Sequence, residues 1–169
     1  MDMQSMNRRS FMARTIIGIV VFIGAALTAT LGGFGVIPAL RKKTPSWSDA
    51  GTAGDLVVDQ PQERRFSEIV KSGWQAEKQE RVIWIVKKSD TSVVAYSSNC
   101  THLGCGYRWV AAQQRFACPC HGSIFDINGK VLAGPAPRPL DTLSARIENN
   151  RILVQYEVFQ LGTADKKLA

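Results

Sequence analysis

The longest apolar run of the chain lies near its N-terminus, where residues 15–37 contain no charged side chain. As a helix rising about 1.5 Å per residue, this run would be roughly 34 Å long, which is enough to cross a bilayer. No small-residue cleavage site follows the run, and Pro38 is expected to end the helix. The pattern predicts one uncleaved transmembrane anchor at 15–37.

Basic residues stand on both sides of this anchor, so the positive-inside rule does not fix its orientation. The pair Arg8-Arg9 ahead of Phe11, however, is the pattern of a twin-arginine export signal. We interpret residues 1–14 as a cytoplasmic tail that carries this signal. The protein is then a single-pass protein of the cell membrane, and its remaining residues form a head on the extracytoplasmic side.

Residues 38–55 lose the apolar periodicity and are rich in proline, serine, glycine and threonine. We predict a flexible linker here, long enough to have a function of its own. Trp47, within this segment, is typical of side chains at a membrane–water interface.

From residue 56 the pattern changes to short runs of β type. Residues 81–87 and 92–97 are β-branched and aromatic around a turn-like stretch, and 143–147 alternates apolar with polar positions, as does 152–158. Asn149-Asn150 favours a tight hairpin, because asparagine tolerates positive φ. Only residues 63–70 have a helical option. We predict an all-β domain of antiparallel sheets at 56–169, carried by one N-terminal transmembrane helix.

Composition narrows the class of protein. A length of 169 residues allows one domain plus an appendage, and 45% hydrophobic residues allow a core. The net charge of +7 comes from basic residues that are scattered or lie beside the apolar run. We therefore expect contact with anionic lipid of the bilayer and no nucleic-acid partner.

All four cysteines and both histidines lie between residues 100 and 123. They form two clusters with one imidazole each: Cys100, His102 and Cys105, then Cys118, Cys120 and His121. Two thiolates and two imidazoles suit a tetrahedral zinc ion. The same set also suits a [2Fe-2S] cluster with two cysteines on one iron and two histidines on the other. Residue types alone leave both sites open, together with a plain disulfide module.

The two clusters, C-T-H-L-G-C at 100–105 and C-P-C-H-G-S at 118–123, resemble the binding boxes of Rieske iron–sulfur proteins of cytochrome bc-type quinol oxidoreductases. The resemblance is close over about residues 97–139, where it implies a small cluster-binding subdomain. It implies one [2Fe-2S] cluster, with Cys100 and Cys118 on one iron and His102 and His121 on the other. It also implies a disulfide between Cys105 and Cys120.

Four further residues receive roles from the resemblance. Ser123 would donate a hydrogen bond to a bridging sulfide, and Leu103 would supply apolar surface at the tip. Pro135 and Pro137 belong to a stiff loop, 134–139, that would pack over the cluster as a third wall.

Imidazole ligands add no negative charge, so such a cluster accepts an electron at roughly −150 to +300 mV, against about −400 mV for plant-type ferredoxins. The outer nitrogens of His102 and His121 would accept a hydrogen bond and then a proton from a quinol. The resemblance thus implies a one-electron carrier subunit of a quinol–cytochrome c reductase in respiratory or photosynthetic electron transport. Its partners would be a b-type cytochrome subunit and a c-type cytochrome subunit in a dimeric complex.

Phe125 departs from the pattern, because ubiquinol-oxidising relatives have a tyrosine there whose hydroxyl donates to a ligand sulfur. One donor fewer lowers the potential, which favours menaquinol as the substrate.

Other functions remain to be weighed against this one. A Rieske oxygenase needs a second iron site, and both histidines are already assigned. A soluble Rieske ferredoxin lacks the anchor. The small Rieske subunit of an exported molybdenum oxidoreductase, of the arsenite oxidase type, remains as an alternative. A non-redox zinc or disulfide module is the other.

Overall fold

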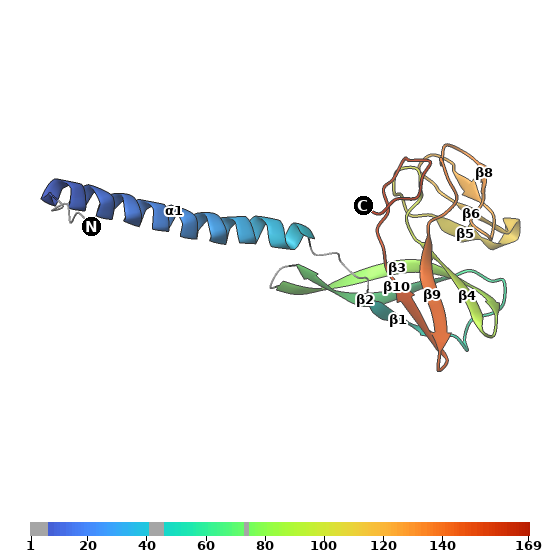
Figure 1. Cartoon of the computed structure of the whole chain (residues 1–169). Coiled ribbons are helices and arrows are strands. Elements are labelled where there is room, and N and C mark those ends of the chain that lie inside the picture. The colour runs from blue at the N-terminus through green and yellow to red at the C-terminus, as the bar shows by residue number, and fades with distance from the viewer. Residues whose placement is uncertain (1–6, 41–45, 73–74) are drawn as a thin grey trace. The chain divides into compact units, whose positions relative to one another are not determined.

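The computed structural model describes residues 7–40, 46–72 and 75–169, with side chains for all of these except 35–40 and 71–72. The chain divides into two compact units, Met1–Thr44 and Pro45–Ala169 (Figure 1). The described residues of the first unit form a helix and those of the second form β-sheets, as predicted.

Helix α1 (Arg8–Leu40) begins after Asn7, whose Oδ1 accepts a hydrogen bond from the Arg9 amide at 3.2 Å. Within Arg8–Phe34, an 18-residue stretch reaches a mean hydropathy of 2.2, and α1 is the one helix among the described residues that is long and apolar enough to cross a membrane. The prediction that Pro38 ends the helix is wrong, since α1 continues to Leu40. A proline so near the C-terminal end removes one backbone donor, and the last turn can still form.

The second unit consists of two antiparallel sheets (Figure 1). The larger sheet has the strand order β1-β10-β9-β4-β3-β2, and the smaller one has the order β5-β6-β7-β8. The strands are β1 (Trp47–Thr52), β2 (Gln62–Ser72), β3 (Gln75–Ser89), β4 (Ser92–Ser97), β5 (Arg108–Val110), β6 (Arg115–Ala117), β7 (Ile124–Phe125), β8 (Val131–Ala133), β9 (Thr142–Glu148) and β10 (Arg151–Gln155), with a 3₁₀ turn at Ala111–Gln113.

Local sequence signals explain much of this pairing. Asn149 and Asn150 both have positive φ, 49° and 60°, and they form the two-residue loop between β9 and β10. Residues 63–70, which also allowed a helix, form part of β2. This strand pairs residue by residue with β3, so the partner strand decides the conformation.

Strand β3 connects the two halves of the head. Ile83 and Ile85 point into the core of the larger sheet, together with Ile152 and Val154. The alternate residue Trp84 points into a second core. Successive side chains of a strand face opposite sides, so one strand serves both cores. The second core holds the predicted metal-binding region, and its members are Trp84, Val86, Tyr96, Cys100, Tyr107, Phe116, Cys118, Phe125, Ala136 and Leu140.

The predicted linker, 38–55, extends too far into the folded head. Trp47–Thr52 forms β1, which pairs with β10, and Ala50 and Ala53 are buried in the larger core. The buried positions of this strand carry small side chains, Ser48 and Ala50, so the apolar pattern does not indicate a strand here. Trp47 lies beneath the guanidinium of Arg146, 4.0 Å from the ring centroid. Residues 41–45 of the predicted linker lie outside the described part of the chain.

Candidate metal centre

Two loops with the same internal hydrogen bonding build the site. The first lies between β4 and β5, where Cys100 accepts a backbone hydrogen bond from Gly104 and donates one to Cys105, both at 2.8 Å. The second lies between β6 and β7, where Cys118 accepts from Gly122 at 3.2 Å and donates to Ser123 at 2.9 Å. Both glycines have positive φ, 80° and 73°, which closes each turn. Each loop therefore presents one cysteine at its base and one histidine on its turn.

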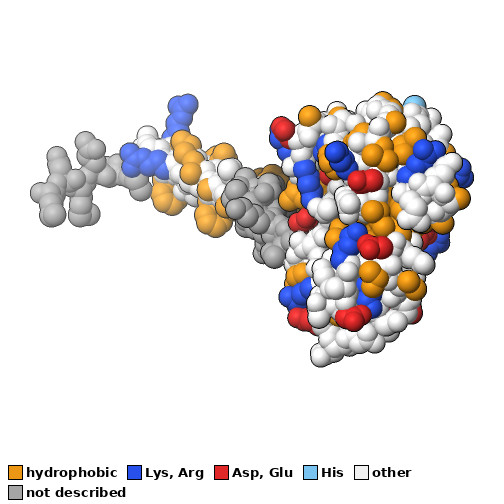
Figure 2. All heavy atoms as spheres, turned by 90° about the vertical axis from the view of Figure 1, so that its right-hand side faces the viewer, with side chains coloured by type: hydrophobic (Ala, Val, Ile, Leu, Met, Phe, Trp, Pro, Cys, Tyr) orange, Lys and Arg blue, Asp and Glu red, His pale blue; other side chains and the backbone are white. Residues whose placement is uncertain are grey.

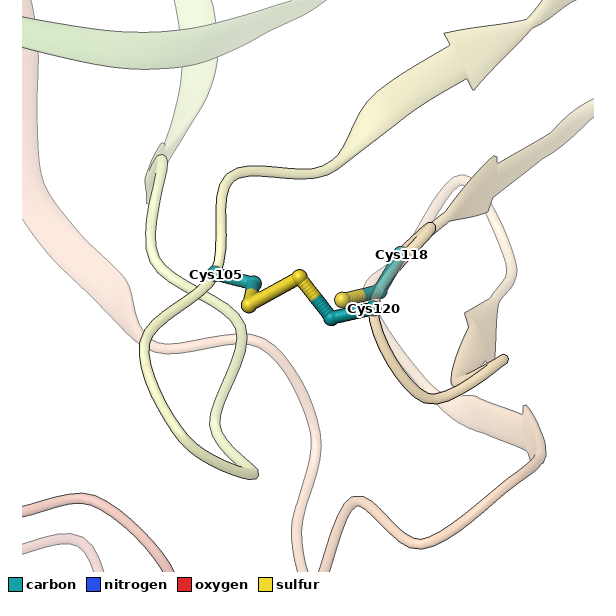
Figure 3. Close-up of side chains that lie close together, drawn as sticks. All are labelled: Cys105, Cys118 and Cys120. Atoms are coloured by element: carbon teal, nitrogen blue, oxygen red, sulfur yellow. A yellow bond between two sulfur atoms is a disulfide. The ribbon is translucent and has the colours of Figure 1, made fainter.

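A disulfide between Cys105 and Cys120 joins the two loops, as the resemblance implied. Figure 3 shows this bond with the sulfur of Cys118 beside it. The three sulfur atoms lie within 4.8 Å of one another. Since two of them are bonded to each other, only Cys118 of this group is available to a metal.

Cys100 and Cys118 are the two free cysteines, and both are buried. Burial raises the pKa of the Cys100 thiol, and the neighbouring Cys118 thiol raises it further, whereas the His102 amide and the Ser123 hydroxyl oppose the rise. With its pKa raised in this way, the Cys100 thiol stays protonated unless a cation is present. A metal ion would reverse this preference, because it stabilises thiolates.

The rings of His102 and His121 lie next to each other, with centroids 4.8 Å apart and planes at 90°. His121 is exposed and His102 is half-buried, and Figure 2 shows a histidine side chain at the surface of the head. Nδ1 of His102 is buried and has no hydrogen-bond partner among the described residues. This nitrogen is free to bind a metal from the inner side of the loop.

Ser123 Oγ is a second buried polar atom without a partner in the described part of the chain. It lies near enough to the Cys100 thiol to lower the pKa of that thiol. Gly134 belongs to the stiff loop 134–139, which we name the proline loop. It packs directly on Ser123, because a Cβ on Gly134 would lie 2.5 Å from Ser123 Cα. The contact with the second loop is thus made by Gly134, whereas Pro135 and Pro137 are exposed and Ala136 is buried.

Aromatic side chains pack in the same core as Cys100 and Cys118. The Tyr107 hydroxyl donates to the Ser97 carbonyl at 2.7 Å, and its ring lies 6.2 Å from that of Phe125, which is fully buried. Burial raises the pKa of Tyr107 well above its usual value, so this hydroxyl stays a donor. Tyr107 was not singled out from the sequence, since a lone tyrosine after the first box carries no motif.

Comparison with known proteins gives the family. The model of the Rieske [2Fe-2S] domain matches residues 47–144. The iron-sulfur subunit 1 of the cytochrome b6-f complex of Trichormus variabilis is 33% identical over 164 residues, which cover 90% of this chain and 86% of that protein. The corresponding subunit of Prochlorococcus marinus (strain NATL1A) is also 33% identical, with the same coverage.

Solved structures include similar chains. The plasma membrane Rieske protein of Synechocystis PCC 6803 is 31% identical, with 64% of this chain and 98% of that chain covered and a TM-score of 0.47. A chain of a hyperthermophilic respiratory Complex III is 28% identical, with 83% and 97% covered and a TM-score of 0.39.

The donor set fits the group that this family binds. Two buried free thiols, a buried unpartnered imidazole nitrogen and a buried unpartnered hydroxyl occur in the two loops that the disulfide joins. Buried polar atoms normally have partners, so a missing group explains all of them together. The chain therefore belongs to the Rieske [2Fe-2S] domain family and carries a cluster of that type.

Proposed function

We propose that the chain is the one-electron carrier subunit of a quinol–cytochrome c oxidoreductase of the cytochrome bc or b–f class. The names of its relatives, iron-sulfur subunits of the cytochrome b6-f complex, support this class. The observation that carries the proposal is the pair of adjacent imidazoles, one exposed and one half-buried, beside exposed Leu103. A carrier needs this access, because its partners must approach the redox group closely.

The proposed ligands are Cys100 and Cys118 for one iron and His102 and His121 for the other. The unpartnered Nδ1 of His102 supports an inner nitrogen as ligand. When bound, the cluster supplies a one-electron acceptor of high potential. Ser123 Oγ is free to donate toward it, and Gly134 with its loop limits the access of water from one side.

His102 and His121 are the residues of this chain that would react with a quinol. An imidazole bound through one ring nitrogen keeps the other for a proton, so it can accept a hydrogen bond from a quinol hydroxyl and then hold its proton. Leu103 is 61% exposed beside His102, and it offers apolar contact to the quinol ring. The same surface would face a b-type subunit during oxidation and a c-type haem afterwards.

Menaquinol is the proposed substrate. Phe125 is fully buried in the second core and carries no hydroxyl, so it cannot donate to a ligand sulfur. With Ser123 as one donor where ubiquinol-type relatives have two, the reduced form is less stabilised and the potential is lower. A lower potential matches a lower-potential quinol.

We further propose that the N-terminus is cytoplasmic and the head extracytoplasmic. Arg8-Arg9 supports export by the twin-arginine route, and the Cys105–Cys120 disulfide supports an oxidising compartment. The head would then move between its partners in a dimeric complex. Prolines inserted in the sequence between the helix and the head should slow cytochrome c reduction without changing the cluster spectrum.

Purification of the tagged full chain from membranes tests this function. We expect b-type and c-type haem to co-purify, together with quinol–cytochrome c reductase activity. Leu103→Ala should lower that activity while it leaves the spectrum of the cluster intact. Co-purification with a molybdenum subunit instead would contradict the proposal.

A further inference from the structure

The segment after β10 folds into a closed loop, which we name the C-terminal loop, 158–169. Its ends are joined by backbone hydrogen bonds at 2.9 Å, from Gln160 to Lys167 and from Ala169 to Val158. Phe159 is buried in the larger core, and Lys166 Nζ lies 4.5 Å from the centroid of its ring. Figure 1 shows this dark-red segment rising from β10 to the smaller sheet. It is therefore a fixed part of the head.

Arg138, the one basic residue of the proline loop, ties that loop to the C-terminal loop. Its side chain is 5% exposed and forms a two-pronged ion pair with Asp141, at 3.0 and 2.8 Å. It also donates to the carbonyls of Thr163, at 2.6 Å, and Gln160, at 2.7 Å, and to Thr163 Oγ1 at 3.1 Å. A guanidinium has five N–H donors, so these contacts use all of them.

Both loops then converge on Thr101, the residue between Cys100 and His102. Thr101 is fully buried, and its Oγ1 donates to the Arg138 carbonyl at 2.8 Å. Its own carbonyl accepts a hydrogen bond from the Gly162 amide at 3.0 Å. The peptide that carries His102 is thus held from two sides.

The loop between β4 and β5, which carries Cys100 and His102, is here called the first binding loop. The C-terminal loop contacts it beyond Thr101 as well. A Cβ on Gly162 would lie 3.4 Å from the His102 carbonyl, and a Cβ on Gly104 would lie 2.7 Å from Leu161 Cδ1. Leu161 therefore packs on the glycine that closes the first loop, and it remains 40% exposed.

We infer that the C-terminal loop positions the first binding loop and thereby the imidazole of His102. It acts through Arg138 of the proline loop, to which it is hydrogen-bonded, and through Leu161, which packs on Gly104. This inference rests on the proposed role of His102 as a ligand. Arg138 and Leu161 are positioning residues, which act through the Thr101 and Gly104 backbone. Groups that orient metal ligands typically change metal affinity by roughly ten- to a hundredfold when they are lost.

The test compares full-length, membrane-bound variants by electron paramagnetic resonance (EPR) of the reduced cluster, by midpoint potential and by the rate of cluster loss to a chelator. One variant is Arg138→Met with Asp141→Leu, which replaces both charges by apolar side chains so that no charge is left buried alone. The other is Leu161→Ala, which truncates a part-exposed side chain and leaves the Arg138 contacts in place. Arg151→Gln is the matched control, since Arg151 pairs with Asp49 at the surface of β1 and β10.

We expect an altered EPR line shape, a shifted potential and faster cluster loss in both variants, by roughly tenfold or more in the double variant. The control should match the wild type. The inference is overturned if Leu161→Ala keeps the wild-type spectrum, potential and rate of cluster loss, whether or not the double variant folds. These readouts need no quinol or partner, so they are independent of the proposed electron transfer. A wild-type chain without a [2Fe-2S] spectrum would contradict the ligand set and this inference together.

Discussion

The imidazole of His121 stands perpendicular to that of His102, with the ring centroids 4.8 Å apart. The two residues come from different loops, which the Cys105–Cys120 disulfide joins. Two imidazoles in this arrangement, with two buried free thiols at the bases of the same loops, form a four-donor set. Removing any one donor should therefore affect the whole site.

His102→Ala and Cys118→Ala should each abolish the cluster, because each removes one of four ligands. Iron content and the visible spectrum of the purified full chain measure this effect. Leu103→Ala is the control, since its side chain lies beside His102 but is exposed. A full Rieske-type spectrum in either ligand variant would show that the assignment is wrong.

Cys105→Ser or Cys120→Ser should leave a cluster that forms but is lost faster. The disulfide closes a segment with a sequence separation of 15 residues, and a cross-link of that size contributes about 3 kcal/mol to the free energy of unfolding. Thermal unfolding and chelator-driven bleaching measure the loss. The double variant should equal the single ones if the cross-link is the cause, whereas unchanged stability in all three would refute this role.

Ser123→Ala should lower the midpoint potential, because its buried Oγ is free to donate toward the cluster. A hydrogen bond to a charged group contributes about 1.5 kcal/mol or more, which corresponds to roughly 60 mV for one electron. Phe125→Tyr should raise the potential, if the new hydroxyl is accommodated in the core beside Tyr107. Potentiometric titration of both variants measures these two shifts of the midpoint potential. A wild-type potential equal to that of ubiquinol-type proteins in the same buffer would rule out menaquinol.

Tyr96 should make the stability of the head depend on alkaline pH. Burial, with a smaller contribution from Asp126, raises the pKa of Tyr96 from 10.0 to about 12. The folded state therefore keeps a proton that the unfolded state loses above pH 10. Its stabilising contribution is complete below pH 10 and declines by roughly 2 kcal/mol as the pH rises toward 12.

Tyr96→Phe tests this dependence. The variant loses the 3.3 Å hydrogen bond to the Ile127 carbonyl, which costs about 1 kcal/mol at neutral pH. Its free energy of unfolding should then fall less steeply between pH 10 and 12 than that of the wild type. Some decline remains, because burial also raises the pKa of Tyr107. Equal slopes for the two proteins would disprove the assignment to Tyr96.

Signals within short segments made much of this protein predictable. The spacing of cysteines and histidines depends on local turns, and the structure brings His102 next to His121 and joins Cys105 to Cys120. Asn149 and Asn150 predict a hairpin, because the tolerance of asparagine for positive φ is a property of the residue itself. The apolar run was likewise sufficient for the helix.

Features that depend on distant partners were not predictable. β1 has small buried residues and is a strand only because β10 pairs with it. Arg138 looked like a charged residue in a rigid turn, yet its partners include Gln160 and Thr163, more than twenty positions away. No periodicity in the sequence indicates a contact of that kind.

Anaerobic addition of menaquinol to membranes that contain the full chain, followed by EPR spectroscopy, tests most directly whether this protein takes an electron from quinol. We predict that the spectrum of a reduced Rieske-type cluster appears on addition of menaquinol and is absent from the Cys118→Ala membranes. A spectrum that dithionite produces but that no quinol produces, in membranes that retain the b-type cytochrome, would contradict the proposed function.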